Sequence, residues 1–201
     1  MLLLHLSSNI IVLLSFLIGL AIAISIHEAS HAFVANLLGD PTAKYQGRMT
    51  LNPLAHLDPI GTILLLLVGF GWGKPVPVNP QYFSRPAIDE LLVALAGPAS
   101  NFLIAGVFGL FAQIAGTGSF ALILAVVVQI NVLLMLFNLI PIPPLDGSKV
   151  FRVLLGERAF RLLELYSLPL IFGLLIILQV SPLGNALSTG VSQLTGFFLG
   201  V

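Results

Sequence analysis

Long apolar runs recur along nearly the whole chain and are separated by short polar or Gly- and Pro-rich stretches. The long runs are residues 9–38, 88–115, 120–140, 160–180 and 183–201, and the last of them is weaker and more polar. A helix of about 20 residues crosses the roughly 30 Å of hydrocarbon in a bilayer. The pattern therefore predicts an all-α polytopic membrane protein with about four to six membrane helices.

One apolar run, residues 59–72, is too short to cross a bilayer. It has only 14 residues, and glycines interrupt and bound it, which favours a short re-entrant or β-like segment after the first helix. Residues 74–79 follow, with prolines at alternate positions. Such a stretch cannot be a central strand, but it can form an exposed edge strand with which another chain can pair.

Composition supports a membrane protein and narrows its chemistry. The 201-residue chain is 58% hydrophobic and only 8% charged, whereas a soluble domain carries about 25% charged residues. We therefore expect residues 1–201 to form a single membrane domain. The net charge is zero and there is no basic block, so nothing favours a nucleic acid partner. Cysteine is absent, so a metal must bind nitrogen and oxygen atoms.

The start of the chain carries no sign of a cleaved signal peptide. Residues 1–9 lack the Lys or Arg of a signal-peptide n-region, and the apolar run after them continues into a polar motif. We expect this start to be retained.

That polar motif lies within the first long helix. His27, Glu28 and His31 fit the pattern H-E-x-x-H, in which a spacing of four residues places both imidazoles on one helix face, close enough to share a zinc ion. Glu28 lies beside that face and can act as a general base toward water. The same five-residue pattern arises by chance on soluble helices. Within an apolar helix, however, three ionisable side chains cost several kcal/mol unless a partner or a metal compensates them, so we predict a metal site.

A catalytic zinc ion usually has three protein ligands and one open position. Asp146 is our choice for the third ligand, because it follows a membrane helix in a proline-rich turn and precedes Gly147, which permits close approach of the backbone. The alternative is an ordinary turn aspartate that caps residues 148–155. His56 and Asp58 are the rival ligands.

Topology links Asp146 to the two histidines. If residues 59–72 do not span the membrane, the helices at 9–38 and 120–140 point the same way, and Asp146 emerges beside the histidines. In that topology all eight basic residues fall on one side: Lys44, Arg48, Lys74, Arg85, Lys149, Arg152, Arg158 and Arg161. Because Lys and Arg accumulate in cytoplasmic loops, we expect the site to lie toward the cytoplasmic side of the cell membrane.

Four blocks of the chain, taken together, resemble a known family. They are HEASH at 27–31, LNPLAHLDPIG at 51–61, GPASN at 97–101 and NLIPIPPLDG at 138–147. Their order resembles that of the site-2 proteases, specifically the compact prokaryotic members without PDZ-like or CBS-like domains. The resemblance covers most of the chain.

The resemblance implies an intramembrane zinc metalloendopeptidase that cleaves transmembrane segments of other proteins in regulated proteolysis. One Zn²⁺ per chain would be held by His27, His31 and Asp146, with Glu28 as the catalytic base. Asn138 would help to hold the substrate backbone or the reacting carbonyl. The partners implied are a transmembrane protein substrate and the lipid bilayer, and no oligomeric state follows from the sequence.

Two other polar residues within these blocks, Asn101 and His56, are candidates for a role near the site. Asn101 is expected to pack a helix interruption at residues 96–101 and to support a metal ligand. His56 could act at a gate, contact the substrate or be solvated in its loop.

Two rival functions belong to other classes. An intramembrane metal transporter would tolerate Gln at position 28 and still move metal, whereas a hydrolase would keep its metal and lose turnover. A catalytically idle membrane scaffold would need neither Glu28 nor Asp146.

Overall fold

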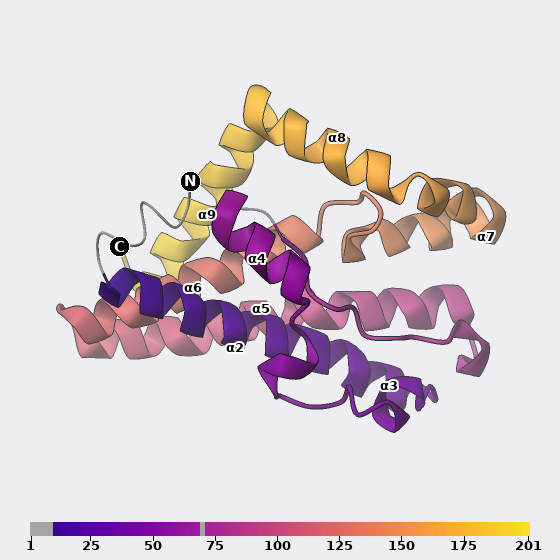
Figure 1. The fold of residues 1–201 in the computed structure, drawn as a ribbon, viewed down its shortest axis with the longest axis horizontal. Helices are drawn as coiled ribbons and strands as arrows, with labels where there is room; N and C mark the ends of the chain where they lie inside the picture. Colours follow the sequence, from indigo (N-terminus) through magenta and orange to yellow (C-terminus); the bar gives the residue numbers. More distant parts are fainter. Residues whose placement is uncertain (1–9, 69–70) are drawn as a thin grey trace.

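Three long helices lie side by side along the long axis of the molecule (Figure 1). They are α2 (Ile10–Leu37), α5 (Pro86–Ala115) and α6 (Ser119–Asn138). The computed structural model describes residues 10–68 and 71–201, so the expectation for residues 1–9 lies outside the described residues. All three helices are long and apolar enough to cross a membrane. This confirms the spans that the apolar runs at 9–38, 88–115 and 120–140 predict.

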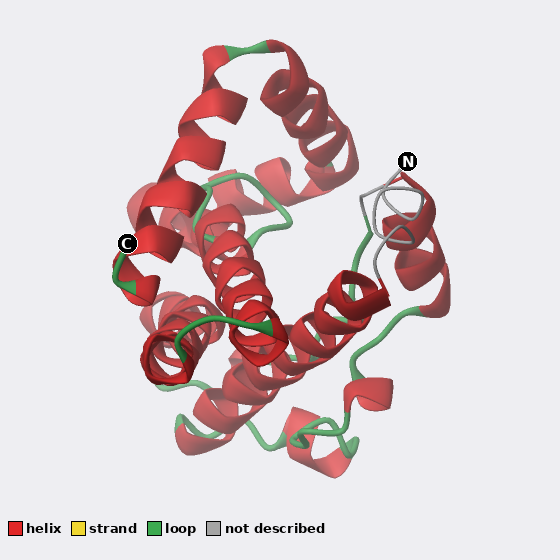
Figure 2. Cartoon of the chain, turned by 90° about the vertical axis from the view of Figure 1, so that its left-hand side faces the viewer, coloured by secondary structure: helices red, strands yellow, loops and turns green. Residues whose placement is uncertain are grey.

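The remaining elements are helices and short turns, and the described residues contain no strand (Figure 2). In chain order they are α3 (Thr42–Tyr45), η1 (Pro53–Ala55), α4 (Pro59–Val68), η2 (Pro80–Tyr82), η3 (Asp146–Lys149), α7 (Val150–Leu165), α8 (Ser167–Val180) and α9 (Pro182–Leu199). Helix α9 packs across α5 and α6 through a cluster of Ala105, Val128, Val132, Val191 and Phe198. The protein is thus an all-α membrane bundle.

The expected helix at residues 160–180 is two helices, α7 and α8, with a bend of 73° between them. Helix α7 carries charged residues such as Glu157 and Arg161, whereas α8 is apolar. The chain therefore turns where the polar sequence gives way to an apolar one. If the bent pair counts as one span, the described residues contain four spans, the lower end of the predicted number.

Helix α4 has only 10 residues, which extend about 15 Å, half of the hydrocarbon thickness. The segment also returns to its starting point. The backbone N–H of Lys74 donates to the carbonyl of His56 at 2.7 Å, and Leu57 bridges to Gly73. The two ends of the segment are therefore adjacent, as expected for a segment too short to cross a bilayer.

Residues 74–79 are not the edge strand that their alternating prolines allow. The N–H of Val76 donates to Glu28 at 3.0 Å, and the N–H of Asn79 donates to Asp40 at 2.7 Å. The carboxylates of Glu28 and Asp40 thus accept hydrogen bonds from backbone N–H groups that pairing with another strand would need.

Helix α5 corrects another expectation, because it continues unbroken through residues 96–101 with Pro98 inside it. The chain reverses between α5 and α6, so the start of α5 lies at the same end of the bundle as the ends of α2 and α6 (Figure 1). The proposed ligands lie at this end.

Candidate metal centre

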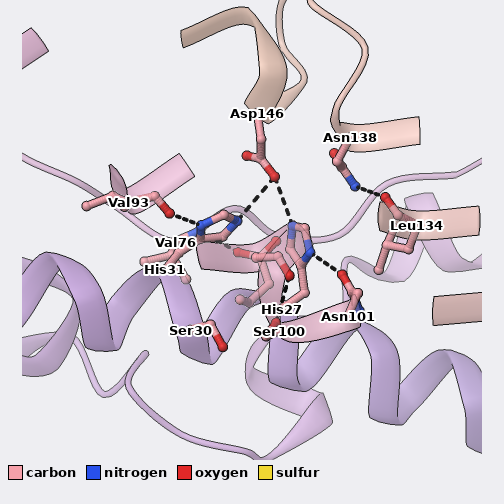
Figure 3. Close-up of polar contacts among 12 residues, drawn as sticks. His27, Ser30, His31, Val76, Val93, Ser100, Asn101, Leu134, Asn138 and Asp146 are labelled. Atoms are coloured by element: carbon pink, nitrogen blue, oxygen red, sulfur yellow. Dashed lines mark hydrogen bonds and ion pairs between the residues drawn. The ribbon is translucent and has the colours of Figure 1, made fainter. Parts of the chain in front are cut away.

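His27, His31 and Asp146 come together although more than 100 residues separate Asp146 from the histidines. Nε2 of His27 lies 3.1 Å from Oδ2 of Asp146, and Nε2 of His31 lies 3.4 Å from the same atom. Both imidazoles are buried in the bundle. One ligand atom from each residue lies within 4.8 Å of the others, and Figure 3 shows the carboxylate above the two rings. His31 is six residues, or about 9 Å, before the end of α2.

Hydrogen bonds at the opposite ring nitrogens define the tautomer of each histidine. Nδ1 of His31 lies 2.7 Å from the carbonyl oxygen of Val93, which can only accept, so this nitrogen is the donor. Nδ1 of His27 lies 2.6 Å from Oδ1 of Asn101. When the rings are neutral, both Nε2 atoms present lone pairs to a carboxylate oxygen. Acceptors that face one another in this way can share a bound metal ion, whereas in its absence a proton on Nε2 bridges them.

Asn101 is itself oriented by a buried chain of amides. Its Nδ2 donates to the carbonyl of Ala23 at 3.2 Å and to Oδ1 of Asn131 at 2.8 Å, and Nδ2 of Asn131 donates to the carbonyl of Val127 at 2.8 Å. These bonds turn Oδ1 of Asn101 toward His27, as expected for a residue that supports a ligand. Asn131 was not among the predicted site residues, although an amide within an apolar run is a signal that the sequence contains.

Two glycines make room for the cluster. A Cβ added at Gly97 would lie 2.5 Å from Nε2 of His31 and 2.6 Å from Nε2 of His27. A Cβ at Gly147 would lie 2.3 Å from the carbonyl oxygen of Leu139. Gly97 thus lets the imidazoles lie against α5, and Gly147 lets the turn with Asp146 pack against the end of α6.

The donor set fits zinc. Ligands about 2.0–2.1 Å from a tetrahedral Zn²⁺ lie about 3.3 Å from one another, and the Nε2 to Oδ2 separations here are 3.1 and 3.4 Å. Oδ2 of Asp146 is buried and has no hydrogen-bond partner among the described residues, which leaves it available to a metal. Two nitrogens and one oxygen would occupy three tetrahedral positions and leave the fourth open.

Glu28 is held by the segment that follows the re-entrant helix. Its Oε2 accepts the N–H of Val76 at 3.0 Å. The structure therefore places residues 74–79 beside the H-E-x-x-H motif, a contact that the sequence does not predict.

Asn138 and His56 make contacts outside the three-ligand group. Nδ2 of Asn138 donates to the carbonyl of Leu134 at 3.0 Å, so this amide is bonded to the backbone of its own helix at the end of α6 (Figure 3). His56 is fully buried and not solvated, and its Nε2 lies 2.8 Å from the carbonyl oxygen of Thr50. Oδ1 of Asp58, the other rival ligand, accepts the N–H of Gly61 at 2.8 Å.

Similarity to known proteins agrees with this site. The family model for peptidase family M50 matches residues 112–178. The chain is also 41% identical, over 84% of its length and 81% of the relative's, to the candidate zinc metalloprotease YwhC of Bacillus subtilis. The chain belongs to peptidase family M50, the site-2 proteases. It is therefore a membrane metalloprotease by family.

Two further relatives of the M50 chain come from other organisms. It is 32% identical to the candidate zinc metalloprotease Rip2 of Mycolicibacterium smegmatis, over 64% of this chain and 52% of the relative. It is 31% identical to the candidate zinc metalloprotease MJ0611 of Methanocaldococcus jannaschii, over 72% of each chain. No solved structure matches the chain.

Proposed function

We propose that this protein is an intramembrane zinc endopeptidase that cleaves peptide bonds in or near transmembrane segments of other proteins. The observation that carries the proposal is the cluster of His27, His31 and Asp146 beside Glu28, about 9 Å inside the end of an apolar helix that can cross a membrane. A hydrolytic site at that depth reaches peptide bonds that lie within or at the edge of the bilayer.

The residues of the chain divide the chemistry between them. His27, His31 and Asp146 would hold one Zn²⁺, which when bound supplies a Lewis acid and makes water acidic enough to lose a proton near neutral pH. Glu28 takes a proton from water on one carboxylate oxygen and later gives it to the leaving amine. The N–H of Val76 keeps the Glu28 carboxylate in place by a charge-assisted hydrogen bond.

Substrate would approach over residues 74–79 and Asn138. A helical substrate hides its carbonyls in hydrogen bonds, so it must unwind before cleavage. Asn138 would orient the substrate backbone. The site would lie toward the cytoplasmic face of a multi-pass protein of the cell membrane, because all eight basic residues lie between α2 and α5 or between α6 and α8, in the segments that follow the ends of α2 and α6.

The test is cleavage of a transmembrane reporter by purified protein in detergent, with bound zinc measured in the same samples. Glu28→Gln should retain one zinc per chain and lose cleavage, whereas the matched control Glu164→Gln, at an exposed position, should retain both. If Glu28→Gln cuts at the wild-type rate, the proposal is wrong. Transport of zinc into liposomes by both wild type and Glu28→Gln, without cleavage of any reporter, would instead indicate a transporter.

A further inference from the structure

Asp146 is supported differently from the two histidines. His27 and His31 lie on the long helix α2, whereas Asp146 begins η3, a turn of four residues after a proline-rich stretch. A metal ligand must be held within about 0.5 Å of its productive position. A short turn needs contacts from elsewhere in the fold to meet that requirement.

One set of these contacts comes from a buried carboxylate near the start of α5, in addition to the packing of Gly147 against the end of α6. Oε1 of Glu90 lies 2.8 Å from Nζ of Lys149, the last residue of η3, and Oε2 of Glu90 contacts the guanidinium of Arg152. The side chains of Glu90 and Arg152 are only 11% and 10% exposed. Nζ of Lys149 also lies 4.8 Å from the centre of the Phe160 ring. This buried ion cluster fastens the end of η3 to α5.

One face of α5 thereby carries residues that help to position all three proposed ligands. Glu90, Val93, Gly97 and Asn101 are spaced by three, four and four residues, which places them on the same helix face. Val93 and Asn101 bind the two histidines, and Gly97 provides the space for their rings. Glu90 is the residue on this face that contacts η3, the turn that carries the third ligand, Asp146.

We infer that Glu90, paired with Lys149 and Arg152, is a positioning residue that holds Asp146 in its place as a metal ligand. The inference rests on the proposed zinc site. Removing the charge of Glu90 leaves two largely buried cations without their shared partner, which is costly, and lets η3 move away from α5.

Two exposed carboxylates provide matched controls. Glu164 contacts Lys149 and Glu157 contacts Arg152, but their side chains are 45% and 41% exposed. Exposed ion pairs contribute little. If loss of any negative charge near the cations weakened zinc binding, Glu157→Gln and Glu164→Gln would weaken it too. If the contacts of Glu90 with Lys149 and Arg152 are what hold Asp146, only Glu90→Gln will weaken it.

The experiment measures zinc affinity of the purified protein in detergent by competition with a chromophoric chelator. Glu90→Gln should bind zinc about 10- to 100-fold more weakly, as is usual for loss of a supporting contact, and Glu157→Gln and Glu164→Gln should stay within about twofold of wild type. The visible absorption of Co²⁺-loaded protein should change in Glu90→Gln and not in the controls. The double variant Glu90→Gln/Arg152→Gln should bind no more weakly than Glu90→Gln, because the two residues act as a unit.

Wild-type zinc affinity and an unchanged cobalt spectrum in Glu90→Gln would overturn the inference, even if the unfolding temperature fell. If Glu90→Gln fails to fold, Glu90→Asp, which keeps the charge on a shorter side chain, is measured in the same way. We expect Glu90→Asp to bind zinc several-fold more weakly than wild type. Wild-type zinc affinity in Glu90→Asp would equally overturn the inference. If wild type binds zinc no better than His31→Ala, the proposed zinc site itself is wrong, which separates the two failures.

Discussion

Replacing Gly97 with alanine tests the geometry of the site with a single methyl group. The added Cβ would lie 2.5 Å from Cε1 of His27 and from Nε2 of His31, about 0.9 Å closer than ordinary van der Waals contact begins. Because α5 and α2 are packed together, the imidazoles must move. Zinc–ligand distances tolerate a change of only about 0.2 Å. We expect zinc affinity to fall by at least about 100-fold, the upper end of the range for a lost supporting contact.

Gly106 provides the control on the same helix. A Cβ there would lie 3.6 Å from the Phe198 ring, which is ordinary contact. Both substitutions replace a helix glycine with alanine, so any change in helix propensity is shared by the two variants. Zinc affinity is measured by chelator competition and folding by thermal unfolding in detergent. If Gly97→Ala binds zinc as tightly as Gly106→Ala, the packing of the imidazoles against α5 does not limit metal binding, which would refute this prediction.

Three further predictions address other parts of the site. Asn131→Leu removes an acceptor from Asn101 and should weaken zinc binding about tenfold by chelator competition, whereas Gln129→Leu, at an exposed position on the same helix, should not. Val76→Pro removes the N–H that donates to Glu28 and should slow reporter cleavage about tenfold with zinc content unchanged. Val76→Ala keeps the N–H and should match wild type. Equal cleavage rates for the two Val76 variants would contradict the role of this N–H. Removing the metal with a chelator should stop cleavage and adding zinc should restore it, and a metal-free sample that still cuts would refute metal dependence.

The bundle could be predicted because its signals are local. The long apolar runs give α2, α5 and α6, and the length of the run at 59–72 indicates a segment that does not span. His27, Glu28 and His31 form one motif on one helix. Asp146 could be predicted as a ligand only from the expected topology of the membrane helices together with the family resemblance.

The contacts that the sequence did not predict join residues far apart in the chain. No spacing pairs Glu90 with Arg152, or Val76 with Glu28, because each contact forms only when the bundle assembles. The break after α7 has a different cause. Hydropathy averaged over residues 160–180 obscures the change from a charged helix to an apolar one, so a single span was expected where the chain bends at Tyr166.

The most direct test of the zinc site is an anomalous difference map from crystals of the protein, with data collected on both sides of the zinc absorption edge. We predict one zinc peak between Nε2 of His27, Nε2 of His31 and the carboxylate of Asp146, and no peak in crystals of Asp146→Asn. A zinc peak elsewhere in a protein that still cleaves the reporter, or an undiminished peak in Asp146→Asn, would contradict the account.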